Sequence, residues 1–172
     1  MKIPSSVSIK QTLAKLPEKI KIPRYIEEKK FYPSTEGRLN IGDGIIEGGI
    51  TEHLAVYYDA VAKNIKSTEG AHISGFAKLI GGEQNYLIVI DNATAADTKV
   101  NTAVLYGRAK ISNSEGVFFE ANDLATLKNI KAEKIVMNGF FTKLKGKNNK
   151  CQELEAPLIW RILNLDFRKQ IL

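Results

Sequence analysis

The side chains that most often carry out chemistry are few in this chain. His53, His72 and Cys151 are the only histidines and cysteine in the sequence. Neither histidine belongs to a recognisable motif with a nucleophile, so no hydrolytic triad is indicated. One cysteine with two histidines supplies too few soft ligands for a zinc or iron site, and it cannot form an internal disulfide. We therefore expect no enzymatic activity, no bound metal and no cofactor.

Two other patterns resemble ligand-binding motifs. The glycines of Gly42-Asp-Gly44 and Gly48-Gly49 suggest a phosphate-binding loop, but no Lys-Ser or Lys-Thr follows and no helix start is evident. Asp59, Asp91 and Asp123 recur at one fixed interval and would form a column of carboxylates if the chain stacks in register. Because stacked like charges repel, we interpret these aspartates as caps of tight turns.

The aspartates belong to an internal repeat. Gly75, Gly107 and Gly139 follow the same 32-residue interval, and the aspartates stand midway between them, which gives a 16-residue half-period. The segments after the glycines agree, because Gly75-Phe-Ala-Lys-Leu79 matches Gly107-Arg-Ala-Lys-Ile111. A fixed period indicates a stacked architecture, in which glycine supplies positive φ and aspartate caps the turn.

The pattern of residue types from Glu36 onward indicates β-structure. Runs of β-branched and aromatic residues alternate with Gly, Asn and Asp, which is typical of short strands and turns. We predict an all-β fold, a right-handed β-helix or solenoid of about 16-residue coils that rise by about 4.8 Å each. The alternative is an antiparallel β jelly roll built from 32-residue hairpin repeats.

The positive charge is concentrated near the start. Residues 1–35 contain eight basic and three acidic residues and hold +5 of the net charge of +6, together with four of the five prolines. We predict a basic, proline-broken N-terminal arm over residues 1–35 and a repeat-built β domain over residues 36–172. No apolar run is long enough to cross a bilayer and the start lacks a secretory signal, so we expect a cytoplasmic protein.

The arm has the character of an interaction surface. Its basic and apolar residues suit an anionic membrane surface or a protein partner, whereas contact with nucleic acid is the less favoured interpretation. Its apolar residues would equally serve to cap the first coil. The candidate docking residues are Lys15, Lys19, Lys21, Arg24, Lys29 and Lys30.

The C-terminal run is a second candidate for interaction. Residues 158–167 are apolar on nearly both faces, as in a strand that is covered on both sides. Such a strand either packs under the arm or leaves an open edge that pairs with another copy of the chain. The candidate self-association residues are Trp160, Ile162, Leu165 and Phe167.

Three segments carry a resemblance to a known family. Ala132-Glu-Lys-Ile-Val-Met-Asn-Gly-Phe-Phe-Thr142 resembles a coil of the bactofilins, the bacterial cytoskeletal polymers. Leu39-Asn-Ile-Gly-Asp-Gly-Ile-Ile-Glu-Gly-Gly-Ile50 is similar to the start of such a core, and His72-Ile-Ser-Gly-Phe-Ala77 to one of its corners. The likeness covers about residues 36–156. It implies a non-enzymatic cytoskeletal scaffold that forms homo-oligomers or filaments end to end and can associate with a membrane.

A second resemblance implies a different function. Ile90-Asp-Asn-Ala-Thr-Ala95, Leu105-Tyr-Gly-Arg-Ala-Lys-Ile111 and Phe119-Glu-Ala121 are similar to the repeated strands of the lipopolysaccharide-export jelly-roll proteins. That family carries lipid along an apolar trough, so this interpretation implies a lipid-binding jelly roll. It ranks second because the signal or anchor that such proteins need is not visible. A nucleic-acid-binding module that uses the basic arm is the third interpretation.

Overall fold

The computed structural model describes residues 30–31 and 35–158, which form two sheets of eight strands each. The short sheet contains, in spatial order, β1 (Lys30–Phe31), β3 (Ile45–Glu47), β5 (Val61–Lys63), β7 (Lys78–Ile80), β9 (Thr94–Ala96), β11 (Lys110–Ser112), β13 (Thr126–Lys128) and β15 (Lys143–Lys145). The long sheet contains β2 (Thr35–Ile41), β4 (Ile50–Val56), β6 (Lys66–Ile73), β8 (Glu83–Val89), β10 (Lys99–Leu105), β12 (Glu115–Ala121), β14 (Lys131–Met137) and β16 (Lys150–Glu155), in the order of the stack.

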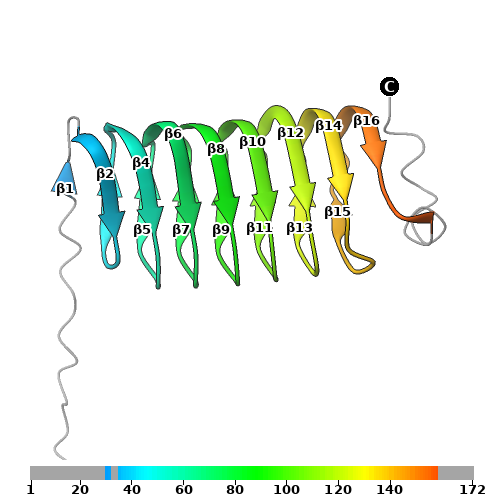
Figure 1. The fold of residues 1–172 in the computed structure, drawn as a ribbon, viewed down its shortest axis with the longest axis horizontal. Coiled ribbons are helices and arrows are strands. Elements are labelled where there is room, and N and C mark those ends of the chain that lie inside the picture. Colours follow the sequence, from blue (N-terminus) through cyan, green and yellow to red (C-terminus); the bar gives the residue numbers. More distant parts are fainter. Residues whose placement is uncertain (1–29, 32–34, 159–172) are drawn as a thin grey trace, which may run out of the picture.

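The strands of both sheets pair in parallel with the strands two places away in the sequence. Lys99 pairs with Glu115 and Glu115 with Lys131, so one turn of the chain is a 16-residue coil. Figure 1 shows the resulting coils stacked side by side along the long axis of the molecule. The predicted solenoid of about 16-residue coils is confirmed. The alternative of an antiparallel jelly roll is wrong, because the 32-residue repeat is two coils and not one hairpin.

The long strands contain a bend. In the pairing of β8, β10, β12 and β14 the third residue of each strand is skipped, as between Val100↔Gly116 and Thr102↔Phe118. At this bend two successive residues, such as Asn101 and Thr102, are not buried, whereas the residues on either side of them are. Since side chains of a straight strand alternate between faces, two consecutive outward residues turn the chain at that point.

The coils keep their register while their lengths differ slightly. β6 has 8 residues where its neighbours have 7, and its pairing shifts between Ser67 and Ala71. The coil that contains β15 is longer still, because Lys131 pairs with Lys150. Both changes leave the inward positions aligned, so that the extra residues lie at bends and corners.

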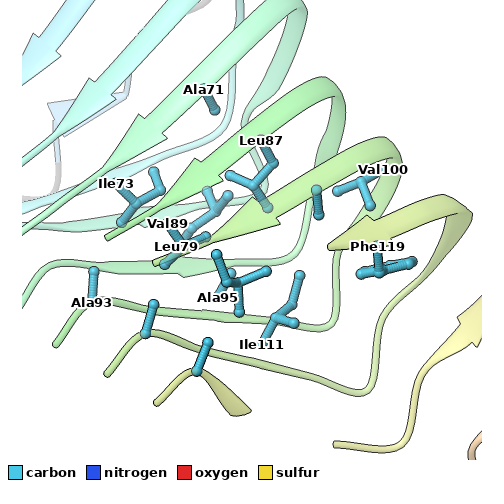
Figure 2. Packing of buried hydrophobic residues seen from close by; sticks show 14 of the residues in the cluster. Ala71, Ile73, Leu79, Leu87, Val89, Ala93, Ala95, Val100, Ile111 and Phe119 are labelled. Atoms are coloured by element: carbon cyan, nitrogen blue, oxygen red, sulfur yellow. The ribbon is translucent and has the colours of Figure 1, made fainter. Parts of the chain in front are cut away.

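The core consists of ladders of inward side chains, each formed by equivalent positions of successive coils. A narrow corner holds the alanines, all fully buried: Ala60, Ala77, Ala93, Ala109 and Ala125. The long sheet contributes Leu54, Ala71, Leu87, Ala103, Phe119 and Ile135. The short sheet contributes Ala62, Leu79, Ala95, Ile111 and Leu127. Figure 2 shows side chains from both sheets meeting in one continuous core.

The two large ladders are complementary in volume. In the four coils from Leu54 to Ile111, a coil with a large residue in the long sheet has a small one in the short sheet, as in Leu87 with Ala95. The next coil reverses the order, with Ala103 and Ile111. The two coils after these four have large residues in both sheets, as in Phe119 with Leu127. Cores reach high density when large and small residues alternate across facing positions. Over these four coils, two consecutive coils form the unit of packing, which is one physical reason for the 32-residue period.

This complementarity predicts coupling between Leu87 and Ala95. Leu87→Ala alone should lower the free energy of unfolding by about 2–5 kcal/mol, and Ala95→Leu alone by about 1–3 kcal/mol. The double variant should lose at least about 1 kcal/mol less than the sum, because the new leucine fills the space left by the old one. Urea unfolding measures all three values. Ala95→Leu with Leu127→Ala, two coils away, is the control and should be additive.

Candidate functional site

The corner between each long strand and the next short strand, here called the first corner, carries the predicted turn residues. Its tightest position has positive φ in successive coils, where it is occupied by Tyr58, Gly75, Asp91, Gly107 and Asp123. Backbone bonds join these corners: the N–H groups of Asn92 and Arg108 donate to the carbonyl oxygens of Gly75 and Asp91 at 3.0 and 2.7 Å. Glycine and aspartate therefore occupy the same position in alternate coils, which the 16-residue half-period reflects.

The alternation separates the carboxylates. The N–H of Gly75 donates to Oδ2 of Asp91 at 3.3 Å, and the N–H of Gly107 donates to Oδ2 of Asp123 at 3.0 Å. Each aspartate thus lies beside a neutral donor of the adjacent coil. Two aspartates in adjacent coils would be about 4.8 Å apart, whereas the observed order doubles that spacing. These residues cap turns, in agreement with their interpretation from sequence.

Asp59 and Gly139 differ from the other members of this ladder. Asp59 lies one position after the positive-φ residue, which is Tyr58, because the extra residue of β6 lengthens that coil. Gly139 does not have positive φ. A Cβ at position 139 would lie 2.6 Å from the carbonyl oxygen of Asp123, so glycine is required there by close approach of two backbones.

The opposite corner forms a second ladder, which the sequence analysis missed. It follows each short strand, and its positive-φ residues are Asn64, Gly81, Asp97, Asn113, Asn129 and Gly146. Nδ2 of Asn129 donates to Oδ1 of Asn113 at 3.0 Å, so these amides bond along the stack. The recurrence of Asn, Asp and Gly once per coil was a visible signal. Asparagine and aspartate are the side chains that best tolerate this backbone conformation after glycine.

The side chains considered for catalysis lie apart. His53 and His72 are exposed in β4 and β6, and Nε2 of His53 lies 3.0 Å from Oε2 of Glu69. Cys151 is buried in β16, near the other end of the long sheet. Across residues 30–31 and 35–158 no three potential metal ligands are grouped, and no helix is long and apolar enough to cross a membrane. Gly42, Gly44, Gly48 and Gly49 lie in the turns that flank β3.

The charges of the described residues are sorted by face. The strands of the short sheet from β3 onward have one acidic residue, Glu47, and these lysines flank their buried central residues: Lys63, Lys78, Lys110, Lys128, Lys143 and Lys145. The long sheet instead pairs its lysines with glutamates, as in Lys66 with Glu83 at 3.0 Å. This sorting is invisible in the net charge of +1 that the sequence leaves for residues 36–172.

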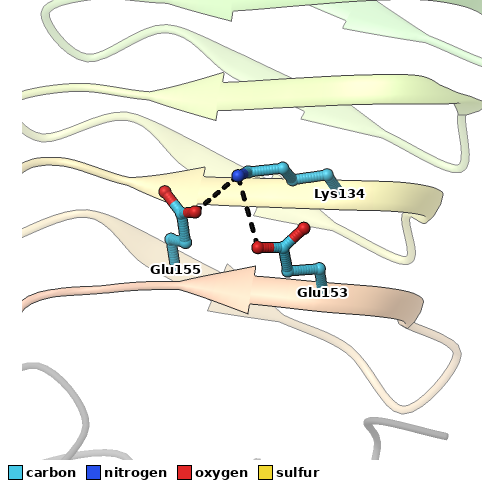
Figure 3. A network of polar contacts seen from close by, with 3 residues as sticks. All are labelled: Lys134, Glu153 and Glu155. Carbon is cyan, nitrogen blue, oxygen red and sulfur yellow. Dashed lines mark hydrogen bonds and ion pairs between the residues drawn. The ribbon is translucent and has the colours of Figure 1, made fainter.

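The ion pairs of the long sheet shift the pKa values of two of their members. The hydrogen bond and the positive charge of Lys66 hold the pKa of Glu83 below its usual value. At the end of the stack Nζ of Lys134 contacts Glu155 and, at 3.3 Å, Glu153 (Figure 3). The hydrogen bond to Glu155 is the main reason that the pKa of Lys134 is raised. These exposed pairs join adjacent strands rather than forming a reactive centre.

Most residues predicted for interaction lie outside the described part of the chain. This holds for Trp160, Ile162, Leu165 and Phe167, and for Lys15, Lys19, Lys21, Arg24 and Lys29. Lys30 begins β1, whose backbone pairs with Ile46 and Glu47 of β3. This strand lies within the segment assigned to the arm, so the short sheet begins before residue 36. Comparisons with protein-family models, curated proteins and solved structures find no match to this chain.

The alternation at the first corner predicts the effect of a third carboxylate. Gly107→Asp would place one between Asp91 and Asp123, whereas Gly107→Asn changes the same atoms without charge. Both residues tolerate positive φ, and both meet the backbone of Asp91, which lies 3.3 Å from the position of a Cβ. The aspartate variant should therefore be less stable than the asparagine variant by about 1 kcal/mol at low salt. The difference should shrink at high salt in thermal unfolding; equal stability at low salt would contradict the repulsion argument.

The environment of Cys151 predicts an unreactive thiol. Burial raises its pKa, so the thiolate is scarcer in the folded protein than in the unfolded chain at the same pH. Its reaction with a disulfide reagent at neutral pH should be at least about tenfold slower than in denaturant. A raised pKa in the folded state also means that its contribution to stability is present below the unfolded pKa and is lost as pH rises through the folded one. A Lys110→Cys variant in a Cys151→Ser background is the exposed control and should react rapidly.

Proposed function

We propose that this protein is a non-enzymatic, bactofilin-like scaffold that self-associates end to end and docks on a membrane or on protein partners. The observation that carries the proposal is the way the sheets end. Within the described residues, β2 and β16 of the long sheet each pair with a strand on one side only, as do β1 and β15 of the short sheet. The unpaired edge of a sheet is a template for another strand.

The repeated pair of strands favours a junction between copies. Each coil contributes one long and one short parallel strand and rises by about one strand spacing, so the end of one stack has the same arrangement of strands as the start of another. The core ladders also become more open toward the ends. Leu39 and Leu154 are partly buried, while Leu54 and Leu87 of the same ladder are fully buried. A second copy placed on an end coil would cover these side chains.

The proposal of a non-enzymatic role rests on where the potentially reactive side chains lie. Catalysis needs a base, a nucleophile or a metal within hydrogen-bond reach of the reacting atoms. His53 pairs with a glutamate at the surface, and the thiol of Cys151 is buried in another coil. The described residues instead repeat one backbone unit along the stack, which suits a structural role.

The lipid-carrier interpretation loses its structural basis. It requires an antiparallel jelly roll with an apolar trough, whereas the strands here are parallel. The space between the sheets is filled by buried side chains such as Phe119, Ile111 and Leu127. No observation on the described residues favours that function over a scaffold.

End-to-end association predicts a sensitive position in the C-terminal run. Phe167→Arg, outside the described residues, should convert filaments or large oligomers into smaller species, because a charge placed in the proposed apolar contact between copies opposes association. Phe76→Arg is the matched control: this residue is 69% exposed on the side of the stack, and its substitution should leave assembly unchanged. Sedimentation velocity and negative-stain microscopy give the measurement. A wild-type protein that remains monomeric at high concentration would contradict the proposed self-association.

A further inference from the structure

The two loops that flank β15 are longer than their counterparts in the preceding coil. Residues 138–142 connect β14 to β15, where residues 122–125 make the equivalent connection one coil earlier. Residues 146–149 connect β15 to β16, where residues 129–130 suffice in the preceding coil. β15 is therefore a short strand between two enlarged loops, at the C-terminal end of the stack in Figure 1.

The first of these loops exposes two adjacent aromatic rings. Phe140 is 59% exposed and Phe141 is 71% exposed. Exposed apolar side chains that lie next to each other add little to the stability of a fold, and they mark contacts with another surface. The rings precede Lys143 and Lys145, which are exposed on either side of the buried Leu144.

The segment that carries the rings is basic, although Asp123 and Glu120 of the preceding coil lie beside the start of the loop. Residues 138–150 contain four lysines and no acidic residue. Lys128 of the neighbouring strand pairs by backbone with Lys145, which adds a further positive charge. None of the lysines 128, 143, 145 and 147 has an ion-pair partner among the described residues. We name the group of Phe140, Phe141, Lys143, Lys145 and Lys147 the β15 tip.

We infer that the β15 tip is a docking site for an anionic lipid bilayer. The two phenylalanines enter the headgroup region, and the lysines bind the negative surface around them. This inference rests on the proposed scaffold and assigns its membrane docking to the folded solenoid, separately from the arm. Charge complementarity selects the occupant: apolar rings in a loop, followed by lysines on the adjoining strand and in the next loop, match an interface that is apolar within and negative outside.

A nucleic acid fits these residues less well. Single-stranded nucleic acids are held in grooves with aromatic platforms along their length, and arginine forks commonly bind the phosphates. Residues 138–150 contain no arginine, and the two rings are at the tip of a loop rather than along a groove. The bilayer is therefore the partner that the geometry favours.

The test is binding of the full-length chain to phosphatidylcholine vesicles with and without phosphatidylserine, measured by flotation. Wild type should bind only the vesicles with phosphatidylserine. Phe140→Ser with Phe141→Ser should reduce the partition coefficient about tenfold. The matched control is Tyr58→Asn with Phe76→Ser, which removes two rings of 71% and 69% exposure from the other end of the same edge. The control should change the binding by less than about twofold.

The lysines are tested in the same assay. Lys143→Gln with Lys145→Gln should lower the partition coefficient by about 25-fold at low salt, since each lysine near such a surface contributes about fivefold. Lys66→Gln with Lys99→Gln removes the same charge from the long sheet, where these lysines face Glu83 and Glu115 at 3.0 and 3.9 Å. This control should retain most of the binding.

Several results would overturn the inference. Equally strong binding of the wild type to vesicles with and without phosphatidylserine would contradict the inference. Equal losses of binding in the tip variants and in their controls would also exclude the tip as the site. Loss of binding only after deletion of residues 1–29 would assign the docking to the arm. Salt-sensitive binding to duplex DNA that depends on Lys143 and Lys145, with normal vesicle binding in the phenylalanine variant, would assign the tip to nucleic acid. Sedimentation velocity of the same variants measures their oligomer size. A variant that loses vesicle binding but keeps its oligomer size has lost docking and not self-association.

Discussion

Parallel, in-register stacking is the constraint on which the rest of this structure depends. A paired residue of an inner coil has counterparts in the neighbouring coils about 4.8 Å above and below it. A favourable contact is therefore repeated along the stack, and so is an unfavourable one. Carboxylates stacked in successive coils repel one another, and large side chains that face each other across the core in every coil would overpack it, so both costs accumulate along the stack. The sequence must vary from coil to coil in a controlled way.

Two alternations meet this constraint with the same period. At the first corner, Asp91 and Asp123 are separated by Gly107, whose N–H donates to the second carboxylate. In the core, Leu87 opposite Ala95 is followed by Ala103 opposite Ile111. Charge spacing and volume matching are independent requirements, and both produce a repeat of two coils. Where both hold, they reinforce the 32-residue spacing of Gly75 and Gly107 in the sequence.

The architecture was predictable because glycine and aspartate are restricted to few backbone conformations. Gly75, Gly107, Asp91 and Asp123 mark one corner, and their spacing was sufficient to infer a coil length. The effect of an inserted residue on the positions of the corners was harder to predict from the sequence. The extra residue in β6 shifts the corner so that Tyr58 takes the strained position beside Asp59, although Asp59 keeps the nominal spacing. Periodicity identifies equivalent residues only while every coil has the same length.

The charge distribution on the surface could not be predicted from the sequence in the same way. Lysines of the short sheet are distributed along the chain from Lys63 to Lys145 and become one face only when the coils stack. Their charge is cancelled in the total by glutamates of the other sheet, such as Glu83, Glu115 and Glu153. The basic arm was visible because its charges are contiguous. A face built from separate coils has no contiguous signature, and only the fold assembles it.

Because both alternations repeat every two coils, two coils are the smallest segment whose duplication preserves them. Duplication of a two-coil segment would lengthen the rod by roughly 10 Å and preserve both the order of corners and the order of core volumes. Duplication of a single coil with an aspartate corner would bring two aspartates together, and between Leu54 and Ile111 it would also interrupt the alternation of large and small core residues. Gene duplication can therefore extend this rod readily in even numbers of coils, and odd numbers need compensating substitutions at the joint.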